Sequence, residues 1–275
     1  MSRPIITFLT DFGPAAPAVC RGVMLGICPD ATIIDISHQV PRYSIRDGAW
    51  TLGFALPYMP VGVHVAVVDP GVGTERLPIA IRAARGDVLI GPDNGLLPGP
   101  AEALGGIAEV RTIQNRDLTL GSISSTFHGR DIFSPVAAHL SSGALYESVG
   151  PTIDRESLVR LPVIRATVAD GQLETSITHV LIFGNVTFAG LPADLEAAVG
   201  PLEDGRPLVV DFQPFAGRPG IREETVWART FGRVPVGDSL LYADSEGRLG
   251  FADNQGDAAS RLGLTVDRPV RISAA

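Results

Sequence analysis

The spacing of apolar residues changes part-way along the chain, and the first part alternates between two patterns. Up to about residue 150, short apolar runs are separated by stretches with helical spacing of their apolar residues. The runs predict buried strands and the stretches predict helices, which together favour an α/β domain with a parallel or mixed sheet and flanking helices, over residues 1–155. The predicted strands are Ile5–Leu9, Thr32–Ile36, Val63–Val68, Ile79–Arg82 and Val88–Ile90, and the predicted helices are Ala16–Ile27, a stretch from Ser44 to Leu56 with Asp47 in its cap, and Ile132–Leu140.

After Gly150-Pro151 the pattern becomes one of short apolar segments separated by turn-forming residues such as Asp170-Gly171 and Gly184-Asn185. Closely spaced strands and turns of this kind are typical of antiparallel sheets and small barrels. We therefore predict a smaller, mostly antiparallel β domain over residues 160–275. Its predicted strands are Ile164–Val168, Val180–Phe183, Leu208–Phe212, Ser239–Tyr242 and Val270–Ile272.

Composition narrows the classes of function. The net charge is −8 and no basic tract occurs, so we expect neither nucleic acid nor a membrane as a partner. No apolar stretch approaches the roughly 20 residues of a membrane span, and the two cysteines, Cys20 and Cys28, predict reduced thiols in a cytoplasmic protein. All 22 basic residues are arginine, which excludes a Walker A phosphate loop, a pyridoxal-phosphate Schiff base and a lysine nucleophile.

The strongest candidate for chemistry is the turn that follows the apolar run Val63–Val68. Asp69 stands where this strand should end, and ligands of open α/β sheets bind at the carboxyl ends of strands. Arg76 lies just beyond, and the segment around His128 is a second glycine-containing turn. Arg76 should keep Asp69 ionised, so that Asp69 orients a water while His128 holds the same water or accepts its proton. The alternative is an ordinary Asp–Arg ion pair beside a structural histidine.

Other polar residues at turns have two interpretations each. Asp11 follows the first strand and is suited either to a ribose diol or to capping the next helix. Asn185 can hydrogen-bond to the edge of an adenine or simply stabilise its tight turn. Phe231 can stack on a ligand or belong to the core, and Ser245 lies in a polar turn. No metal site is expected, because the histidines lack metal-binding spacing and His64 lies within a buried strand.

Several of these residues belong to segments that resemble one protein family when taken in order. The segments are Thr10-Asp11-Phe12-Gly13, Val68-Asp69-Pro70-Gly71-Val72-Gly73 with Arg76, Gly91-Pro92-Asp93-Asn94-Gly95, Phe127-His128-Gly129-Arg130-Asp131-Ile132-Phe133 and Phe183-Gly184-Asn185. Over nearly the whole chain they resemble the S-adenosylmethionine (SAM) hydroxide adenosyltransferases, or SAM hydrolases, which are related to fluorinase and chlorinase. The resemblance implies an α/β domain followed by a β domain, and a homotrimer with its sites between neighbouring subunits.

The resemblance also implies a reaction, in which water or hydroxide attacks the 5′ carbon of SAM to give adenosine and methionine. Because the sulfonium is already an excellent leaving group, no cofactor is expected. Asp69, Arg76 and His128 correspond to the Asp–Arg–His triad of the hydrolases, whereas the halogenases carry other residues there and bind halide. The implied substrate contacts are Asp11 for the ribose hydroxyls, Trp50 for the sugar pocket, Asn185 and Phe231 of a neighbouring subunit for the adenine, and Ser245 for the methionine carboxylate.

The chain departs from the family pattern at the methionine end. Relatives carry an Asp, a ligand of the methionine amine, just before the Phe-Gly-Asn segment and a Thr-Asn just after it, where this chain has Val180-Leu181-Ile182 and Phe188-Ala189. Losing a carboxylate partner for an ammonium group should cost about 1.5–3 kcal/mol. We therefore predict weak affinity for the methionine end, or a substrate without a normal amino-acid tail. The competing functions are halogenation at the 5′ carbon and non-catalytic binding of adenosine or SAM.

Overall fold

The computed structural model describes residues 3–275, which fall into two compact units. The first unit ends at Leu161 and the second begins at Pro162. Each unit has its own sheet and its own hydrophobic core, and each is described here by itself.

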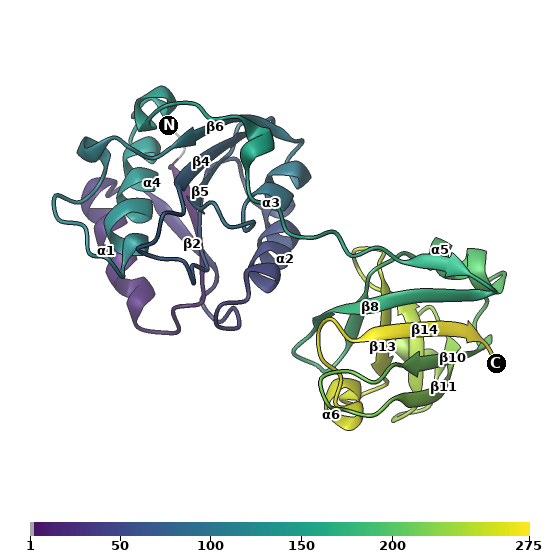
Figure 1. Ribbon diagram of the computed structural model, residues 1–275. Helices are drawn as coiled ribbons and strands as arrows, with labels where there is room; N and C mark the ends of the chain where they lie inside the picture. The colour runs from purple at the N-terminus through teal and green to yellow at the C-terminus, as the bar shows by residue number, and fades with distance from the viewer. Residues whose placement is uncertain (1–2) are drawn as a thin grey trace. The chain divides into compact units, whose positions relative to one another are not determined.

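Within residues 3–161, six strands form one mixed sheet in the order β2-β1-β3-β5-β4-β6 (Figure 1). β1, β2, β3 and β5 run parallel, and β4 runs antiparallel to both of its neighbours. The predicted α/β fold with a parallel or mixed sheet is therefore confirmed. The strands are β1 Ile5–Thr10, β2 Thr32–Ser37, β3 Val63–Val67, β4 Pro78–Ala83, β5 Val88–Pro92 and β6 Ile107–Thr112.

Helices cover both faces of this sheet (Figure 1). One face packs on α1 (Ala16–Ile27) and α4 (Ser134–Ser141), and the other packs on α2 (Ile45–Ala55) and α3 (Pro98–Ala103). The side chain of Ser44 caps α2 by accepting a hydrogen bond from the Asp47 backbone N–H, as predicted. Short helical turns complete the unit, at Leu56–Tyr58, Arg116–Leu118, Gly129–Phe133, Tyr146–Val149 and Arg155–Ser157.

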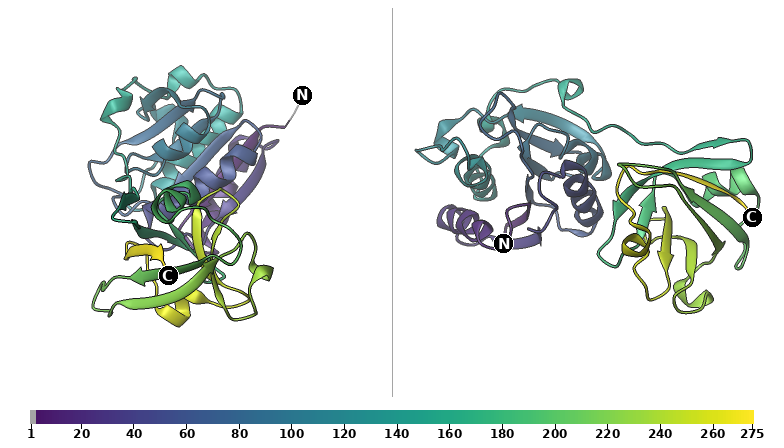
Figure 2. Two further views of the ribbon diagram at one scale, coloured as in Figure 1. Left: turned by 90° about the vertical axis from the view of Figure 1, so that its right-hand side faces the viewer. Right: turned by 60° about the horizontal axis from the view of Figure 1, so that its bottom comes forward.

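Residues 162–275 contribute eight strands, in the order β14-β10-β11-β12-β13-β9-β8-β7. The additional pairing of β14 with β8 closes seven of them into a barrel, with β7 attached as a hairpin partner of β8 (Figure 2). All pairs are antiparallel except β11 with β12, so the predicted β domain is confirmed. The elements are β7 Thr167–Ala169, β8 Gln172–Val180, β9 Val186–Phe188, α5 Pro192–Val199, β10 Pro207–Phe212, β11 Ile221–Trp227, the helical turn Phe231–Arg233, β12 Ser239–Ala243, β13 Leu249–Asp253, α6 Ala258–Leu262 and β14 Pro269–Ala274.

The predicted strand Val180–Phe183 is wrong. β8 ends at Val180, and the chain turns at once into β9, with the Leu181 N–H donating to the Asn185 carbonyl at 2.8 Å. Gly184 has φ +81°, which supplies the left-handed conformation that this tight turn needs. The apolar run misled the prediction because Ile182 and Phe183 lie at the tip of the hairpin, 92% and 76% exposed. The expected strand Ile164–Val168 is also displaced, since β7 begins only at Thr167.

No helix within residues 3–275 combines the length and the apolar character that crossing a bilayer requires.

Candidate functional site

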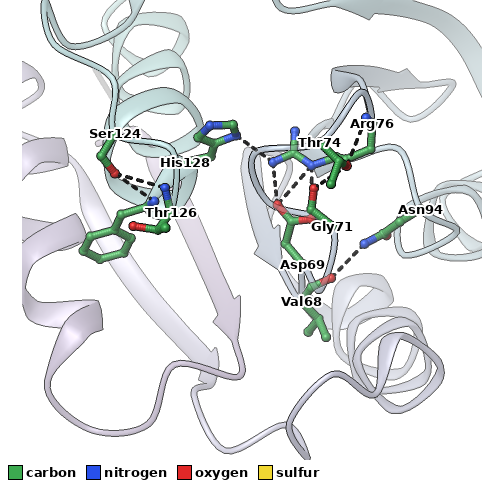
Figure 3. A network of polar contacts seen from close by, with 10 residues as sticks. Val68, Asp69, Gly71, Thr74, Arg76, Asn94, Ser124, Thr126 and His128 are labelled. Atoms are coloured by element: carbon green, nitrogen blue, oxygen red, sulfur yellow. Dashed lines mark hydrogen bonds and ion pairs between the residues drawn. The ribbon is translucent and has the colours of Figure 1, made fainter.

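Asp69 and Arg76 form an ion pair directly after the central strand β3 (Figure 3). The Arg76 Nε atom donates to both carboxylate oxygens of Asp69, at 3.1 and 3.0 Å, and Nη2 donates to one of them. The Arg76 side chain is 10% exposed and the Asp69 side chain 5%, so the ion pair is largely removed from water. Asn94 holds the end of the strand by donating from Nδ2 to the Val68 carbonyl at 2.8 Å. The Asp69 carboxylate is thus fixed at the carboxyl edge of the sheet.

His128 joins this pair through Arg76 (Figure 3). The His128 Nδ1 atom lies 2.9 Å from Arg76 Nη2. A guanidinium can only donate, so Nδ1 accepts this hydrogen bond and the imidazole proton is carried by Nε2. Burial lowers the pKa of His128 below its ordinary value of 6.5, and the charge of Arg76 lowers it further against the opposite effect of Asp69 and Asp131. His128 is therefore neutral at pH 7, with an Nε2–H group as its available donor.

The two turns are packed against each other through backbone. Gly73 has φ +77°, and a Cβ atom placed on it would lie 2.4 Å from the Ser125 carbonyl oxygen. The Arg76 guanidinium also lies over the Phe133 ring, with Cζ 5.2 Å from the ring centroid. The segment Gly129–Phe133 is a π-helical turn that leads into α4, a conformation that is frequent at functional sites. At position 73, only a glycine permits the close approach of the two backbones.

Asp131 anchors the turn that carries His128. Its carboxylate is buried, with Arg130 Nε donating at 2.6 Å and the Ser124 backbone N–H donating at 2.8 Å. Burial alone would raise the pKa of Asp131, but the hydrogen bonds from Arg130 and Ser124 outweigh it and lower the pKa. Asp131 is thus an ionised structural residue beside the candidate site.

The two predicted sugar contacts of the first unit, Asp11 and Trp50, have different neighbours. Asp11 does not cap α1, because the N-cap residue of this helix is Ala15. Asp11 Oδ2 instead accepts a hydrogen bond from the Tyr43 backbone N–H at 3.0 Å. Tyr43 has φ +65° and is 70% exposed, so an open aromatic side chain lies next to Asp11. Trp50 lies within α2, where its ring stacks on Phe54 at 5.8 Å. Tyr43 was missed, although a strained backbone beside a carboxylate often marks a functional site.

In the second unit, Asn185 and Phe231 are brought together by Tyr242, a residue that the sequence did not single out. Asn185 hydrogen-bonds to the Tyr242 side chain, and the rings of Phe231 and Tyr242 are 4.9 Å apart. Burial raises the pKa of Tyr242, the charge of Asp244 adds to this, and the bond to Asn185 opposes it. Phe231 is 38% exposed, so its ring is accessible for stacking. Ser245 lies exposed in the turn that follows β12.

His64 is a core residue, as interpreted from its position in a buried strand. Its ring bridges Thr7 Oγ1 at 2.9 Å and Asp87 Oδ1 at 2.8 Å, and both His64 and Asp87 are fully buried. Across residues 3–275, no group of three or more His, Cys, Asp or Glu side chains is arranged to hold a metal ion.

Comparison with known proteins identifies the family. A model of the SAM hydroxide adenosyltransferase N-terminal domain matches residues 6–150, and a model of the C-terminal domain matches residues 175–271. The chain belongs to the SAM hydroxide adenosyltransferase family.

Named relatives within this family fall into two groups. An (R)-S-adenosyl-L-methionine hydrolase of Salinispora tropica is 44% identical, with 98% of each chain covered, and one of Salinispora arenicola is 41% identical, with 99% of each covered. A fluorinase of Actinopolyspora mzabensis is 29% identical, over 99% of this chain and 98% of its own. A crystal structure of an uncharacterized conserved protein from Thermotoga maritima superimposes with a TM-score of 0.84 at 33% identity, covering 98% of this chain and 99% of that one.

Proposed function

We propose that this SAM hydroxide adenosyltransferase hydrolyses SAM to adenosine and L-methionine, and that Asp69, Arg76 and His128 hold the attacking water. The observation that carries the proposal is the 44% identity, over 98% of both chains, to a relative named as a SAM hydrolase. The geometry is consistent with it, because a buried carboxylate and a neutral imidazole joined by one guanidinium offer both acceptors and donors to a water molecule.

In the proposed reaction the water oxygen forms a bond to C5′ while the C5′–S bond breaks, and its electron pair stays on sulfur as methionine is released. The nucleophile loses a proton, which the Asp69 carboxylate can accept or pass to solvent. His128 cannot be the base through Nδ1, which already accepts from Arg76, so it positions the water by donating from Nε2–H. The catalytic contribution is then alignment of water with C5′ in a site of limited hydration. No cofactor takes part in this step.

The substrate contacts remain part of the proposal. Asp11 would bind the ribose hydroxyls and Trp50 would line the sugar pocket, with Tyr43 added because it lies beside Asp11. Asn185 and Phe231 would hold the adenine, supported by their shared contact with Tyr242. The expected homotrimer, with sites between subunits, likewise stays a prediction. The exposed apolar tip formed by Ile182 and Phe183 is in keeping with a further protein contact.

Halogenation is the second candidate, since relatives named fluorinase share the fold at 28–29% identity. A halide next to the largely buried Asp69 carboxylate would be repelled by a like charge, so this residue favours water. Non-catalytic binding of adenosine or SAM is the third candidate.

The deciding experiment incubates the protein with SAM in ¹⁸O-water, with and without chloride, and reads the products by mass spectrometry. Adenosine carrying ¹⁸O at C5′ supports hydrolysis, a 5′-chloro product supports halogenation, and bound adenosine without turnover supports the binding function. Asp69→Asn and His128→Ala should each lower kcat by about 100-fold or more while adenosine still binds. Asp30→Asn, at an exposed carboxylate, is the control. A near-normal rate in either test variant would remove that residue from the proposed site.

A further inference from the structure

Asp11 is the proposed ribose ligand, and its carboxylate stands on a short turn that directly follows β1. The turn bends at Gly13, which has φ +70°. Asp11 Oδ2 accepts a hydrogen bond from the Tyr43 backbone N–H, whereas no residue within the described range 3–275 hydrogen-bonds to Oδ1. Tyr43 therefore holds one carboxylate oxygen, and the direction of the other depends on how the backbone of the turn is fixed.

A bulge in the pairing of β1 with β2 brings His38 beside this turn. Phe8 pairs with Asp35. The next residue of β1, Leu9, pairs with Ser37, so β2 contains one extra residue at this point. Bulges are over-represented at sheet edges and next to active sites, where they redirect a side chain. Here the bulge directs the ring of His38 edge-to-face against Phe8, with the ring centroids 4.8 Å apart.

His38 is linked to the turn on both sides of Asp11. Its Nδ1 atom lies 2.9 Å from Thr10 Oγ1, and Thr10 Oγ1 in turn accepts a hydrogen bond from the Phe12 backbone N–H at 3.2 Å. The His38 carbonyl accepts from the Gly13 N–H at 3.0 Å. One residue thus connects to the position before Asp11 and to the two positions after it.

The direction of the hydrogen bond between His38 and Thr10 follows from Asp35. Asp35 Oδ1 lies 3.1 Å from His38 Nε2, and a carboxylate at this position favours the tautomer with its proton on Nε2. Nδ1 then accepts from the Thr10 hydroxyl, whose oxygen remains free to accept from the Phe12 N–H. Thr10 is fully buried and the His38 side chain is 13% exposed, so these hydrogen bonds face little competition from water.

We propose, resting on the ribose contact that the proposed function gives to Asp11, that His38 is a positioning residue for this carboxylate. His38 acts without touching the substrate, because it fixes the backbone on both sides of Asp11 and so directs Oδ1 toward the ribose hydroxyls. Productive contacts of this kind need the ligand-binding group to be held within about 0.5 Å. Loss of the His38 side chain should therefore weaken recognition of the hydroxyls rather than of the whole nucleoside.

The test compares the calorimetric affinities of adenosine and 2′-deoxyadenosine, which differ in one ribose hydroxyl. Wild-type protein should bind adenosine about tenfold or more tightly, because the deoxy compound lacks a hydrogen bond to a carboxylate. His38→Ala should reduce this preference to about threefold or less. His38→Asn should keep the preference, since its side-chain oxygen can replace Nδ1 as the acceptor. His139→Ala, at a half-buried histidine of α4, is the matched control.

Two further measurements separate positioning from a general effect on the fold. Thr10→Val removes only the hydroxyl between His38 and the turn, and it should reduce the preference as His38→Ala does. In an Asp11→Asn background, His38→Ala should have no further effect on the preference, because the residue through which it acts is already changed. With SAM, His38→Ala should raise KM by about tenfold with little change in kcat.

An unchanged preference for adenosine in both His38→Ala and Thr10→Val would overturn the proposal. Equal weakening of adenosine and 2′-deoxyadenosine would also overturn it, because that result is expected of a purely structural residue. Equal affinities in wild-type protein would remove Asp11 as the ribose ligand, and the role of His38 with it. Absence of adenosine formation from SAM would count against the proposed hydrolysis alone, since the affinities are measured without turnover.

Discussion

Replacement of Gly73 by alanine tests whether contact between the two turns sets the candidate site. The alanine Cβ would lie 2.4 Å from the Ser125 carbonyl oxygen, whereas ordinary contacts begin near 3.4 Å. Both sides of this contact are backbone, so no side-chain rotation can relieve it. The turns must separate by the difference between these two distances, about 1 Å.

The expected cost has two parts. A non-glycine residue with φ near +77° costs about 1–2 kcal/mol of folding free energy. The separation then moves Arg76 away from His128, and their 2.9 Å hydrogen bond lengthens beyond the range of a good one. Displacement of reacting groups by about 1 Å can lower a rate by about 100-fold. We expect Gly73→Ala to lose about 1–2 kcal/mol or more of stability and about 100-fold in kcat.

The assay combines urea denaturation with steady-state hydrolysis of SAM at a temperature where the variant is fully folded. Gly143→Ala is the matched control, because Gly143 has φ +99° but nothing within 4 Å of the added Cβ. It should lose a similar amount of stability with no change in kcat. Equal kcat values for Gly73→Ala and wild type would refute the reasoning that this contact sets the geometry of the site. If Gly143→Ala lost as much kcat as Gly73→Ala, the lower rate would be assigned to general destabilisation.

Two further predictions follow from titratable groups. The rate of hydrolysis should fall as the pH is lowered through the pKa of His128, which lies below 6.5, because a protonated Nδ1 cannot accept a hydrogen bond from Arg76. A pH–rate profile of kcat/KM whose acid limb lies above pH 6.5 would contradict this. Asp87→Ala should lower the free energy of unfolding by about 3–5 kcal/mol, since it leaves His64 and Arg85 without their shared buried carboxylate. Urea denaturation measures this loss, and wild-type stability in the variant would contradict it.

The sheet of the first unit was predictable because its buried strands are nearly continuous apolar runs. The strand was predicted at Val63–Val68 and is observed at Val63–Val67. The polar residues that follow it lie at the carboxyl edge of the sheet, as expected. Asp69, Arg76 and His128 could therefore be predicted to lie together, although their catalytic role stays a prediction. The hydrogen bond between Arg76 and His128 Nδ1 could not be predicted, because it depends on how two turns far apart in the sequence pack.

The second unit was harder to predict because its strands are short and half polar. β11 (Ile221–Trp227) has three charged residues in seven, and its place in the barrel comes from pairing with β10 and β12. Tyr242 was missed for a related reason. Its contact with Asn185 exists only because β13 pairs with both β12 and β9, which no local pattern records.

The position of Arg76 between two partners constrains how this family can change its chemistry. Substituting Asp69 alone leaves a nearly buried guanidinium without its carboxylate, whereas substituting the whole group by uncharged residues removes every unpaired charge. Intermediates with one substitution are therefore less stable than either end point. Evolution between members named hydrolase and members named fluorinase is therefore expected to proceed through coupled substitutions, because a single exchange at Asp69 lowers stability and the rate together without supplying a new nucleophile.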